Sequence, residues 1–414
     1  MSFSNETVYD AKTAMRARED FPALERKHNG EYLAYFDGPG GTQVPNAVID
    51  AVSDYYRRYN ANIHGAFVTT NETDEMLQGA REAMADFLGA ESWRCISFGA
   101  NMTTLNFSLA HAIAKGMREG DEIVVTELDH EANRGPWLNL RQYGVVVREV
   151  ELLPSGELDY DDMREKITER TKVVALGMSS NALGTANNVA TARNLSRRAG
   201  ALLVLDAVHY APHHPIDVQQ IDPDFLICSA YKFYGPHVGV LYSRTGALDA
   251  LEADALSTQE PEAPYKIETG TLNHASIAGA LAAVDYIASY GSGSTRREKI
   301  ASAMRAIAAY EHDLAVRYYD EVQKIPGVSV VGPGFDGPRV PTVSVAIDGI
   351  EPAEAARQLG EKAICTWDGD FYAARTIEVL GLKERGGVLR IGISMYNTEE
   401  EVERLLEGIG NLKK

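Results

Sequence analysis

Seven short apolar stretches alternate with helix-like stretches between Ser92 and Arg244, and this alternation is compatible with few folds. The predicted strands are CISFGA (95–100), EIVVTE (122–127), VVVREVEL (145–152), KVVALGMSS (172–180), ALLVLDAV (201–208), DFLICSA (224–230) and GVLYSR (239–244). Several are continuously apolar and rich in Val and Ile, which is typical of strands covered on both faces. We therefore predict an α/β fold with an open, mainly parallel central sheet and helices on both faces.

The sequence pattern changes after about Ala275. Two long Ala-rich helical stretches precede the short strands VPTVSVAI and VLRIGIS, and a final helix begins near Thr398. We predict a large domain over residues 31–275 and a smaller α+β domain over residues 276–414. Residues 1–30 are predicted to form a helical arm that packs on the small domain.

Charge and composition exclude several classes of partner. The formal net charge is −19 and no Lys/Arg-rich run occurs, so no nucleic-acid partner is expected. No apolar run reaches the roughly 18 residues that span a bilayer, and the first residues lack the apolar core of a secretory signal. Three cysteines without a CxxC pair predict a reducing, cytoplasmic location. The adjacent His213 and His214 lack further ligands at suitable spacing, so no metal site is expected.

One lysine stands at an unusual place. Lys232 lies in SAYKFYGP, directly after the buried strand predicted over DFLICSA. Burial penalises the charged ammonium form, and the aromatic neighbours Tyr231, Phe233 and Tyr234 argue against an exposed lysine. A buried lysine with a lowered pKa can form a Schiff base with a carbonyl compound.

Other polar residues follow neighbouring strands at their carboxyl ends, where open α/β sheets bind ligands. They are Asn101, His130, Asn181 and Asp206. Each has an ordinary structural explanation, as a helix cap, a salt-bridge partner or a hydrogen-bonding group. We expect them to converge with Lys232 on a single site.

Together these residues match the needs of pyridoxal phosphate (PLP). That cofactor requires a Schiff-base lysine, an acid beside its ring nitrogen, a phosphate cup and a group that stacks on its ring. Asp206 can be the acid, the 100–104 turn with Ser229 can form the cup, and His130 can stack. A nucleotide is less well supported, because the chain has no GxGxxG after a first strand and no GxxxxGK[ST].

A series of motifs extends from about Tyr32 to about Leu412. They are YFDGPGGTQVPNAVIDAV (35–52), ANIHG (61–65), ELDHEAN (127–133), SNALGT (180–185), HHPIDVQ (213–219), YKFYGP (231–236), ETGTLN (268–273) and LRIGISMYNT (389–398). In this order they resemble the class V aminotransferase family of fold-type I PLP enzymes, close to its cysteine desulfurase and selenocysteine lyase branch. The resemblance implies the fold-type I architecture.

The resemblance implies a role for each matching residue around the cofactor ring. Lys232 would form the Schiff base and move the substrate Cα proton. Asp206 would keep the pyridine nitrogen protonated, His130 would stack on the ring, and Asn181 would hydrogen-bond the phenolic oxygen. The phosphate site would be lined by Ala100, Asn101, Met102 and Ser229.

Three further residues follow from the resemblance. Thr271 would reach the phosphate of the neighbouring subunit's cofactor, which implies a homodimer. Arg390 would bind the substrate α-carboxylate, a task that suits the planar guanidinium. His64 falls at the active-site entrance, where it faces the substrate or caps a loop.

Two positions near the cofactor depart from the desulfurase pattern. Histidine His209 stands where these enzymes usually carry glutamine, and Tyr231 stands where they usually carry histidine. The Tyr231 phenol can still donate a hydrogen bond to phosphate. His209 can donate near the phenolic oxygen, and it can also titrate near neutrality.

The largest departure concerns the nucleophile of the desulfurases. Those enzymes carry a cysteine on a loop upstream of the Arg390-like arginine, and here the stretch is CTWDGDFYAARTIEV (365–379). The aligned position falls near Gly369, Asp370 or Phe371, and none is cysteine. We interpret Cys365 as a small buried hydrophobe, and Cys95 and Cys228 in predicted strands likewise.

The resulting hypothesis is a PLP enzyme that acts on a small amino acid through Schiff-base chemistry. Desulfurase-like or selenocysteine lyase-like cleavage of a Cβ–S or Cβ–Se bond comes first, and direct elimination is favoured over a persulfide because the loop cysteine is missing. Alternatives are a class V aminotransferase, an epimerase or a decarboxylative carbon–carbon enzyme. A PLP-binding scaffold or sensor is the non-enzymatic alternative, and the complete set of Lys232, Asp206, His130 and Arg390 argues against it.

Overall fold

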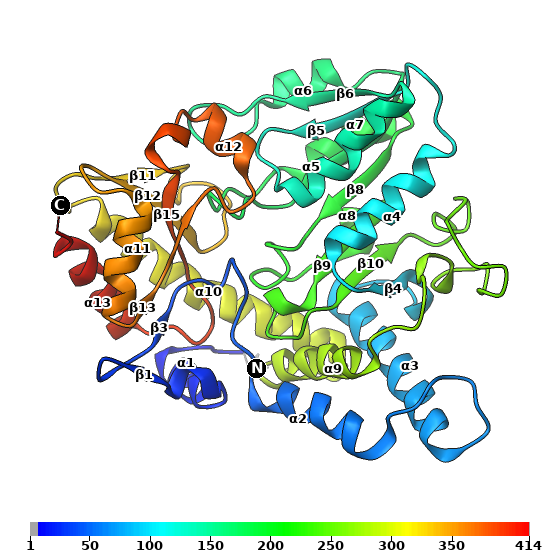
Figure 1. Cartoon of the computed structure of the whole chain (residues 1–414), viewed down its shortest axis with the longest axis horizontal. Coiled ribbons are helices and arrows are strands. Elements are labelled where there is room, and N and C mark those ends of the chain that lie inside the picture. Colours follow the sequence, from blue (N-terminus) through cyan, green and yellow to red (C-terminus); the bar gives the residue numbers. More distant parts are fainter. Residues whose placement is uncertain (1–6, 414) are drawn as a thin grey trace, which may run out of the picture.

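The structure is a computed structural model that describes residues 7–413. Its centre is a seven-stranded sheet in the order β4-β10-β9-β8-β7-β5-β6 (Figure 1). The strands are β4 (Ile96–Gly99), β5 (Glu122–Thr126), β6 (Val146–Val150), β7 (Thr171–Gly177), β8 (Leu202–Asp206), β9 (Phe225–Ser229) and β10 (Gly239–Ser243). Each predicted strand is present, and the α/β prediction is confirmed.

One strand departs from the parallel arrangement. β10 pairs antiparallel with both β9 and β4, while β5, β6, β7, β8 and β9 pair parallel with one another. A parallel crossover needs about a dozen residues or more, and the connection from Ser229 to Gly239 is too short for one. The chain reverses there through a turn in which Tyr234 has a φ of 68°.

Both faces of the central sheet are buried, because successive side chains of a strand point to opposite faces. Ile123 and Val125 of β5 belong to one apolar cluster, and Val124 between them belongs to the other. Helices α4 and α5 cover one face, and α3, α7 and α9 cover the other. The helices of this part are α2 (Asn46–Asp54), α3 (Val68–Leu88), α4 (Met102–Ala114), α5 (Glu131–Leu138), α6 (Tyr160–Lys166), α7 (Val189–Ala199), α8 (Val218–Ile221) and α9 (His274–Ser289).

A second, four-stranded sheet lies beside the first (Figure 1). Its strands are antiparallel, in the order β11 (Val328–Val331), β12 (Thr342–Ile347), β15 (Val388–Gly392) and β14 (Trp367–Gly369). The helices that accompany it are α10 (Arg296–Val322), α11 (Pro352–Glu361), α12 (Ala374–Val379) and α13 (Glu399–Gly410). A short parallel pair, β3 (Ala34–Tyr35) with β13 (Ile364–Cys365), joins it to the beginning of the chain. The domain boundaries at residues 31 and 276 stay predictions.

The N-terminal helix α1 (Ala11–Glu19) packs against the end of the chain, and a hairpin of β1 (Lys27–His28) and β2 (Glu31–Tyr32) follows. The Tyr9 hydroxyl donates to the Met395 carbonyl at 3.0 Å. Arg18 pairs with Glu401 of α13 at 2.8 Å. These contacts fit the predicted arm, whose first six residues lie outside the described residues.

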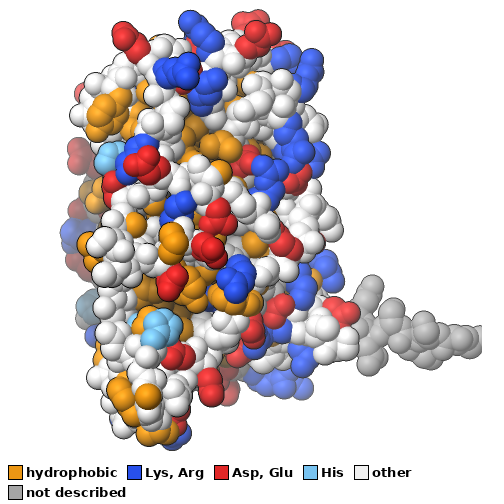
Figure 2. Space-filling view, turned by 90° about the vertical axis from the view of Figure 1, so that its right-hand side faces the viewer, with side chains coloured by type: hydrophobic (Ala, Val, Ile, Leu, Met, Phe, Trp, Pro, Cys, Tyr) orange, Lys and Arg blue, Asp and Glu red, His pale blue; other side chains and the backbone are white. Residues whose placement is uncertain are grey.

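The surface carries charges of both signs. On the face drawn in Figure 2, blue and red side chains lie intermixed, without a continuous basic patch. No helix within residues 7–413 is both long and apolar enough to cross a membrane.

Candidate active site

A cavity lies at the carboxyl ends of β7, β8 and β9, against the beginning of α4; we call it the Lys232 cavity. Its walls bring together the five strand-end residues that the sequence singles out. The lining residues are Asn101, Met102, Thr103, His130, Ala132, Gly177, Ser179, Asn181, Asp206, Val208, His209, Ser229, Tyr231 and Lys232. The predicted convergence is therefore present, and it follows from the shared edge at which parallel strands end.

Lys232 lies in the 3₁₀ turn Ala230–Lys232 that follows β9, and its side chain is buried. The Nζ atom donates to the carbonyls of Pro39 and, at 3.1 Å, Gly40. The pKa of Lys232 is lowered to about 7, mainly by burial and also by the positive charge of Arg390, while Asp37 and Asp206 oppose the shift. A large share of the amine is therefore neutral, and nucleophilic, near pH 7.

Asp206 is the last residue of β8, and its carboxyl lines the same cavity. Its Oδ1 accepts the Val208 N–H at 2.9 Å. Burial raises the pKa of Asp206 to about 7, and the charge of Asp129 adds to the rise. A cationic nitrogen placed beside this carboxyl would favour its ionised form.

His130 caps helix α5 and lines the cavity at the same time. Its Nδ1 accepts the Ala132 N–H at 2.9 Å, which assigns the proton of the neutral ring to Nε2. Burial lowers the pKa of His130 to about 4, and the charges of Lys232 and Arg390 add to the effect. The ring is therefore a neutral imidazole on the cavity wall at pH 7.

The beginning of α4 lies on the cavity wall. Asn101 is the N-cap, with Oδ1 accepting the Thr104 N–H at 2.9 Å, and the Met102 N–H donates to Ser229 Oγ at 3.0 Å. The first-turn N–H groups and the dipole of this 13-residue helix favour a phosphate. Thr103, which was not predicted, lines the cavity one position further along this first turn.

On the cavity wall, the buried residues His209 and Asn181 each present a polar atom that finds no hydrogen-bond partner among residues 7–413. His209 holds its Nε2 at 3.0 Å from Thr342 Oγ1, and its Nδ1 has no partner. Asn181 donates from Nδ2 to the Phe371 carbonyl at 2.9 Å, and its Oδ1 has no partner. The expectation that His209 titrates near neutrality is wrong, because burial holds its pKa well below the ordinary value.

Arg390 is buried in β15, which excludes the alternative of a surface salt bridge. Its Nη2 lies 2.7 Å from Asp37 Oδ1, its Nη1 donates to the Asn181 carbonyl at 3.2 Å, and Nε has no partner within the described chain. The Phe371 ring lies over the guanidinium, 4.1 Å from its carbon. Both terminal nitrogens of the guanidinium are thus bonded within the protein, and Nε is its only nitrogen without a partner among residues 7–413.

Asp37 was not predicted as a site residue. It stands after β3 at the start of the turn Gly38–Gly41, and its Oδ1 accepts the hydrogen bond from Arg390 Nη2. A Cβ at Gly40 would lie 2.2 Å from Asp37 Oδ2, so glycine is required there by close approach. The only sequence signal was an acid ahead of a glycine-rich turn.

The comparisons with known proteins agree with this geometry. The Aminotransferase class-V family model matches residues 34–405. The chain belongs to the class V aminotransferase family. It is 33% identical to a probable cysteine desulfurase of Streptomyces coelicolor and 32% identical to one of Vibrio cholerae, over 95–96% of this chain and 96% of each relative.

Solved structures of cysteine desulfurases share the fold of this class V enzyme. The apo enzyme from Thermococcus onnurineus NA1 superposes with a TM-score of 0.86 at 28% identity, over 95% of this chain and 96% of the other. CsdA from Escherichia coli, solved as an S-sulfonic acid, gives 0.84 at 28% identity, over 96% and 97%. The class V enzyme is thus PLP-dependent, as its family is.

The residues of this chain fit the cofactor. A buried lysine of lowered pKa stands beside a buried acid whose pKa is raised. The first turn of α4 lies on the same cavity, and His209 Nδ1 is a buried polar atom without a partner among residues 7–413. Each group matches a part of PLP that needs a covalent anchor, an acid, an anion site or a polar contact.

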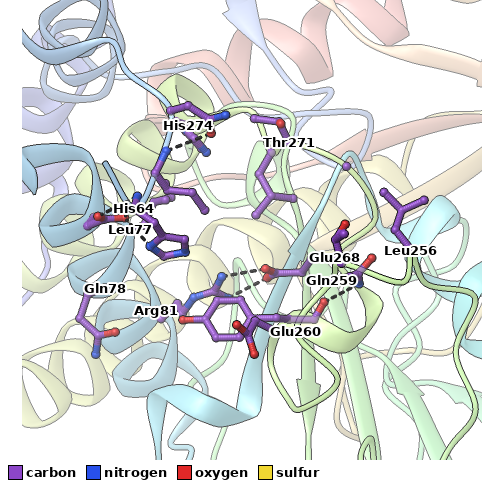
Figure 3. Close-up of a pocket in the computed structure, with 17 residues that line it drawn as sticks. His64, Leu77, Gln78, Arg81, Leu256, Gln259, Glu260, Glu268, Thr271 and His274 are labelled. Carbon is purple, nitrogen blue, oxygen red and sulfur yellow. Dashed lines mark hydrogen bonds and ion pairs between the residues drawn. The ribbon is translucent and has the colours of Figure 1, made fainter. Parts of the chain in front are cut away.

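Four of the predicted residues do not line the Lys232 cavity: Arg390, His64, Thr271 and Ala100. His64 and Thr271 line a second cavity of about 770 Å³, shown in Figure 3 with the buried Arg81–Glu268 pair at its base. Ala100 is exposed and lines, with Thr271, another cavity beside α4. Their predicted roles, including the reach of Thr271 into a neighbouring subunit, stay predictions.

None of the three cysteines lines the Lys232 cavity of the class V enzyme. Cys228 is fully buried in β9, and burial raises the pKa of the half-buried Cys365 in β13. Cys95 ends the 3₁₀ turn Trp93–Cys95 just before β4, so its predicted place inside the strand is wrong by one residue. The described part of the chain therefore offers no thiol at this cavity.

Proposed function

We propose that this chain cleaves the Cβ–S or Cβ–Se bond of a small amino acid without storing the released atom on a cysteine of its own. The named relatives are probable cysteine desulfurases, which supports a sulfur-containing amino acid as substrate. The proposed absence of a cysteine carrier rests on one observation: no cysteine lines the Lys232 cavity. Near it, the Phe371 carbonyl accepts a hydrogen bond from Asn181, and the Phe371 ring lies on Arg390.

Lys232 and Asp206 provide the proton chemistry in this proposal. When bound, PLP supplies an electron sink for the charge that develops at the substrate Cα. The Lys232 amine would hold the cofactor, and as a free amine it would take the proton from the substrate Cα, which its lowered pKa favours. Asp206 holds a proton at the ring nitrogen, and the neutral His130 ring stacks without adding a positive charge.

The anionic ends of cofactor and substrate are held by different elements. The first turn of α4, with Asn101, Met102 and Ser229, binds the phosphate, and Tyr231 stands close enough to assist. Arg390 binds the α-carboxylate with its unpartnered Nε edge. His209 Nδ1, held by the Thr342 contact at Nε2, faces the phenolic oxygen together with Asn181.

A homodimer and a cytoplasmic location complete the proposal. Thr271 is exposed and lines a cavity beside the start of α4, which supports a role across a subunit interface. His64 is exposed on the second cavity, and its Nδ1 lies 3.4 Å from Asp74 Oδ1. In this proposal His64 would contact only a substrate bound in the neighbouring subunit. Three free cysteines support the reducing compartment.

The test uses purified holoenzyme with L-cysteine and L-selenocysteine. The overall reaction converts cysteine and water to pyruvate, ammonia and hydrogen sulfide, so sulfide and pyruvate form in equal amounts. Alanine with a protein-bound persulfide would contradict the absence of a sulfur carrier. Keto acid formed by amino-group transfer would support an aminotransferase instead, and a spectral change without any product would support a sensor.

A further inference from the structure

The segment between β14 and α12, residues 369–373, has a strained backbone; we call it the 369–373 loop. The φ angles of Gly369, Phe371 and Tyr372 are 107°, 56° and 59°, so three of its residues are left-handed. Side chains other than glycine pay on the order of 1 kcal/mol for this conformation, and it persists only where surrounding contacts hold it. Such strain is common at ligand clamps.

The contacts that hold the loop come from the walls of the Lys232 cavity. Asn181 Nδ2 donates to the Phe371 carbonyl at 2.9 Å, and the Glu131 N–H donates to the Tyr372 carbonyl at 2.7 Å. Asn181 lines the cavity, and Glu131 directly follows the lining residue His130. Two main-chain carbonyls of the loop thus bond it to Asn181 on the cavity wall and to the residue that follows His130.

A turn inside the loop gives its two aromatic side chains different surroundings. Asp370 Oδ1 accepts the Tyr372 N–H at 2.9 Å, and its carbonyl accepts the Ala373 N–H at 2.8 Å, as expected of a turn residue. The Phe371 side chain is 8% exposed and lies on Arg390, whereas Tyr372 is 73% exposed. Phe371 is thus the aromatic residue of the loop that covers Arg390, whereas the Tyr372 ring lies 5.7 Å from the ring of His130.

We propose that Phe371 is a specificity-determining residue whose ring forms the wall against the side chain of the bound amino acid. The inference rests on the proposed function, because it takes Arg390 as the carboxylate ligand. A substrate whose carboxylate meets the guanidinium edge has its Cβ only two bonds from that carboxylate carbon. Its side chain therefore points along the ring that covers the guanidinium face at 4.1 Å.

The chemistry of this wall defines the class of substrate. A phenyl ring offers neither a hydrogen-bond partner nor a counter-charge, so a charged substrate side chain would be desolvated without compensation. The ring also fills the space that a long or branched side chain needs. The site is thus suited to amino acids with small, uncharged side chains such as a thiol or a methyl group.

The experiment measures binding without turnover in the holoenzyme. Dissociation constants for L-alanine and L-leucine are obtained from the change in cofactor absorption. We expect the wild-type protein to prefer L-alanine, and Phe371→Ala to reduce that preference by about tenfold or more, since a few methylenes in a pocket carry such discrimination. Trp367→Ala, at a 55% exposed position of β14, is the matched control and keeps the wild-type preference.

An unchanged preference in folded Phe371→Ala would overturn the proposal. Phe371→Leu is the second variant; it keeps an apolar side chain and is expected to give an intermediate preference. The products formed from L-cysteine by the wild-type protein test the proposed function separately. If the preference for L-alanine depends on Phe371 but the protein forms no sulfide, the role of Phe371 in specificity stands and the proposed reaction is wrong.

Discussion

The two sides of the Lys232 cavity are built in opposite ways. Lys232, Asp206 and Ser229 stand at the ends of regular strands, and none of them has a positive φ. The 369–373 loop on the other side is left-handed at two aromatic residues and depends on bonds from Asn181 and Glu131. The side that we propose for the cofactor is fixed by the sheet, whereas the side that we propose for the substrate is fixed by a strained loop.

The difference indicates a division of labour. A scaffold of strand ends positions groups within narrow limits, which suits chemistry common to a whole family. A loop can change its side chains without disturbing that scaffold, which suits the selection of a substrate. Substitutions at the strand ends should therefore reduce the chemistry itself, whereas substitutions in the loop should change the selection of the substrate.

The largest effect is expected on the sheet side. Lys232→Ala removes the only amine at the cavity, so the borohydride-reducible chromophore and all turnover should be lost, at least about a thousandfold. Absorption spectra after borohydride treatment and a product assay measure both. The exposed Lys172→Ala is the control. A reducible chromophore that persists in Lys232→Ala would remove the PLP anchor from this residue.

Arg390→Lys tests the point at which the two sides meet. The substitution keeps the charge but loses the planar fork that serves Asp37 and the carboxylate together. We expect KM to rise about 10- to 100-fold, since hydrogen bonds to charged groups are worth roughly 1.5–3 kcal/mol each. Steady-state kinetics measure it, with the exposed Arg385→Lys as control. An unchanged KM would exclude Arg390 as the carboxylate ligand.

The pH dependence of Lys232 sharpens the description of the sheet side. A pKa of about 7 places the reactive neutral amine above that pH. Labelling of the apoenzyme by pyridoxal and borohydride should therefore rise about tenfold from pH 6 to pH 8 and then level off. Peptide mapping isolates the Lys232 adduct from those of exposed lysines. A rate that keeps rising to pH 10 would show an unperturbed lysine.

The smallest change in rate is expected when a cysteine replaces a residue of the 369–373 loop. The product, in contrast, should change. In Phe371→Cys the thiolate can attack the substrate sulfur, the Cβ–S electron pair goes to carbon, and a proton completes alanine. We expect some alanine and a persulfide on the new cysteine, detected by mass spectrometry. Tyr372→Cys, at a position where the side chain is 73% exposed, is the matched control. A persulfide in both variants, or in neither, would contradict the inward orientation of Phe371.

Most of the sheet side could be predicted from sequence. Continuous Val- and Ile-rich runs define buried strands, and polar residues directly after such runs fall on one edge. The direction of β10 was missed, because the periodicity of an apolar run does not report whether a strand is parallel. The pKa of His209 was missed because its burial depends on packing against Thr342, far along the chain.

The loop side could not be predicted in the same way. The Asp37–Arg390 pair joins residues 353 positions apart, and no local pattern reports such a contact. Phe371 and Tyr372 adopt angles that their own side chains disfavour, so tertiary contacts overrule local preference there. The resemblance to the desulfurases indicated only that the loop cysteine is missing. The contact of the Phe371 ring with Arg390 is seen only in the fold.

The fastening of the 369–373 loop has an evolutionary consequence. Phe371 and Tyr372 are held through their carbonyl oxygens, which every amino acid carries. Substitutions at position 371 could therefore change the substrate range while the 369–373 loop keeps its hydrogen bonds. Glycine at this position would also relieve the backbone strain. A new substrate range would then lie one codon away from an intact catalyst.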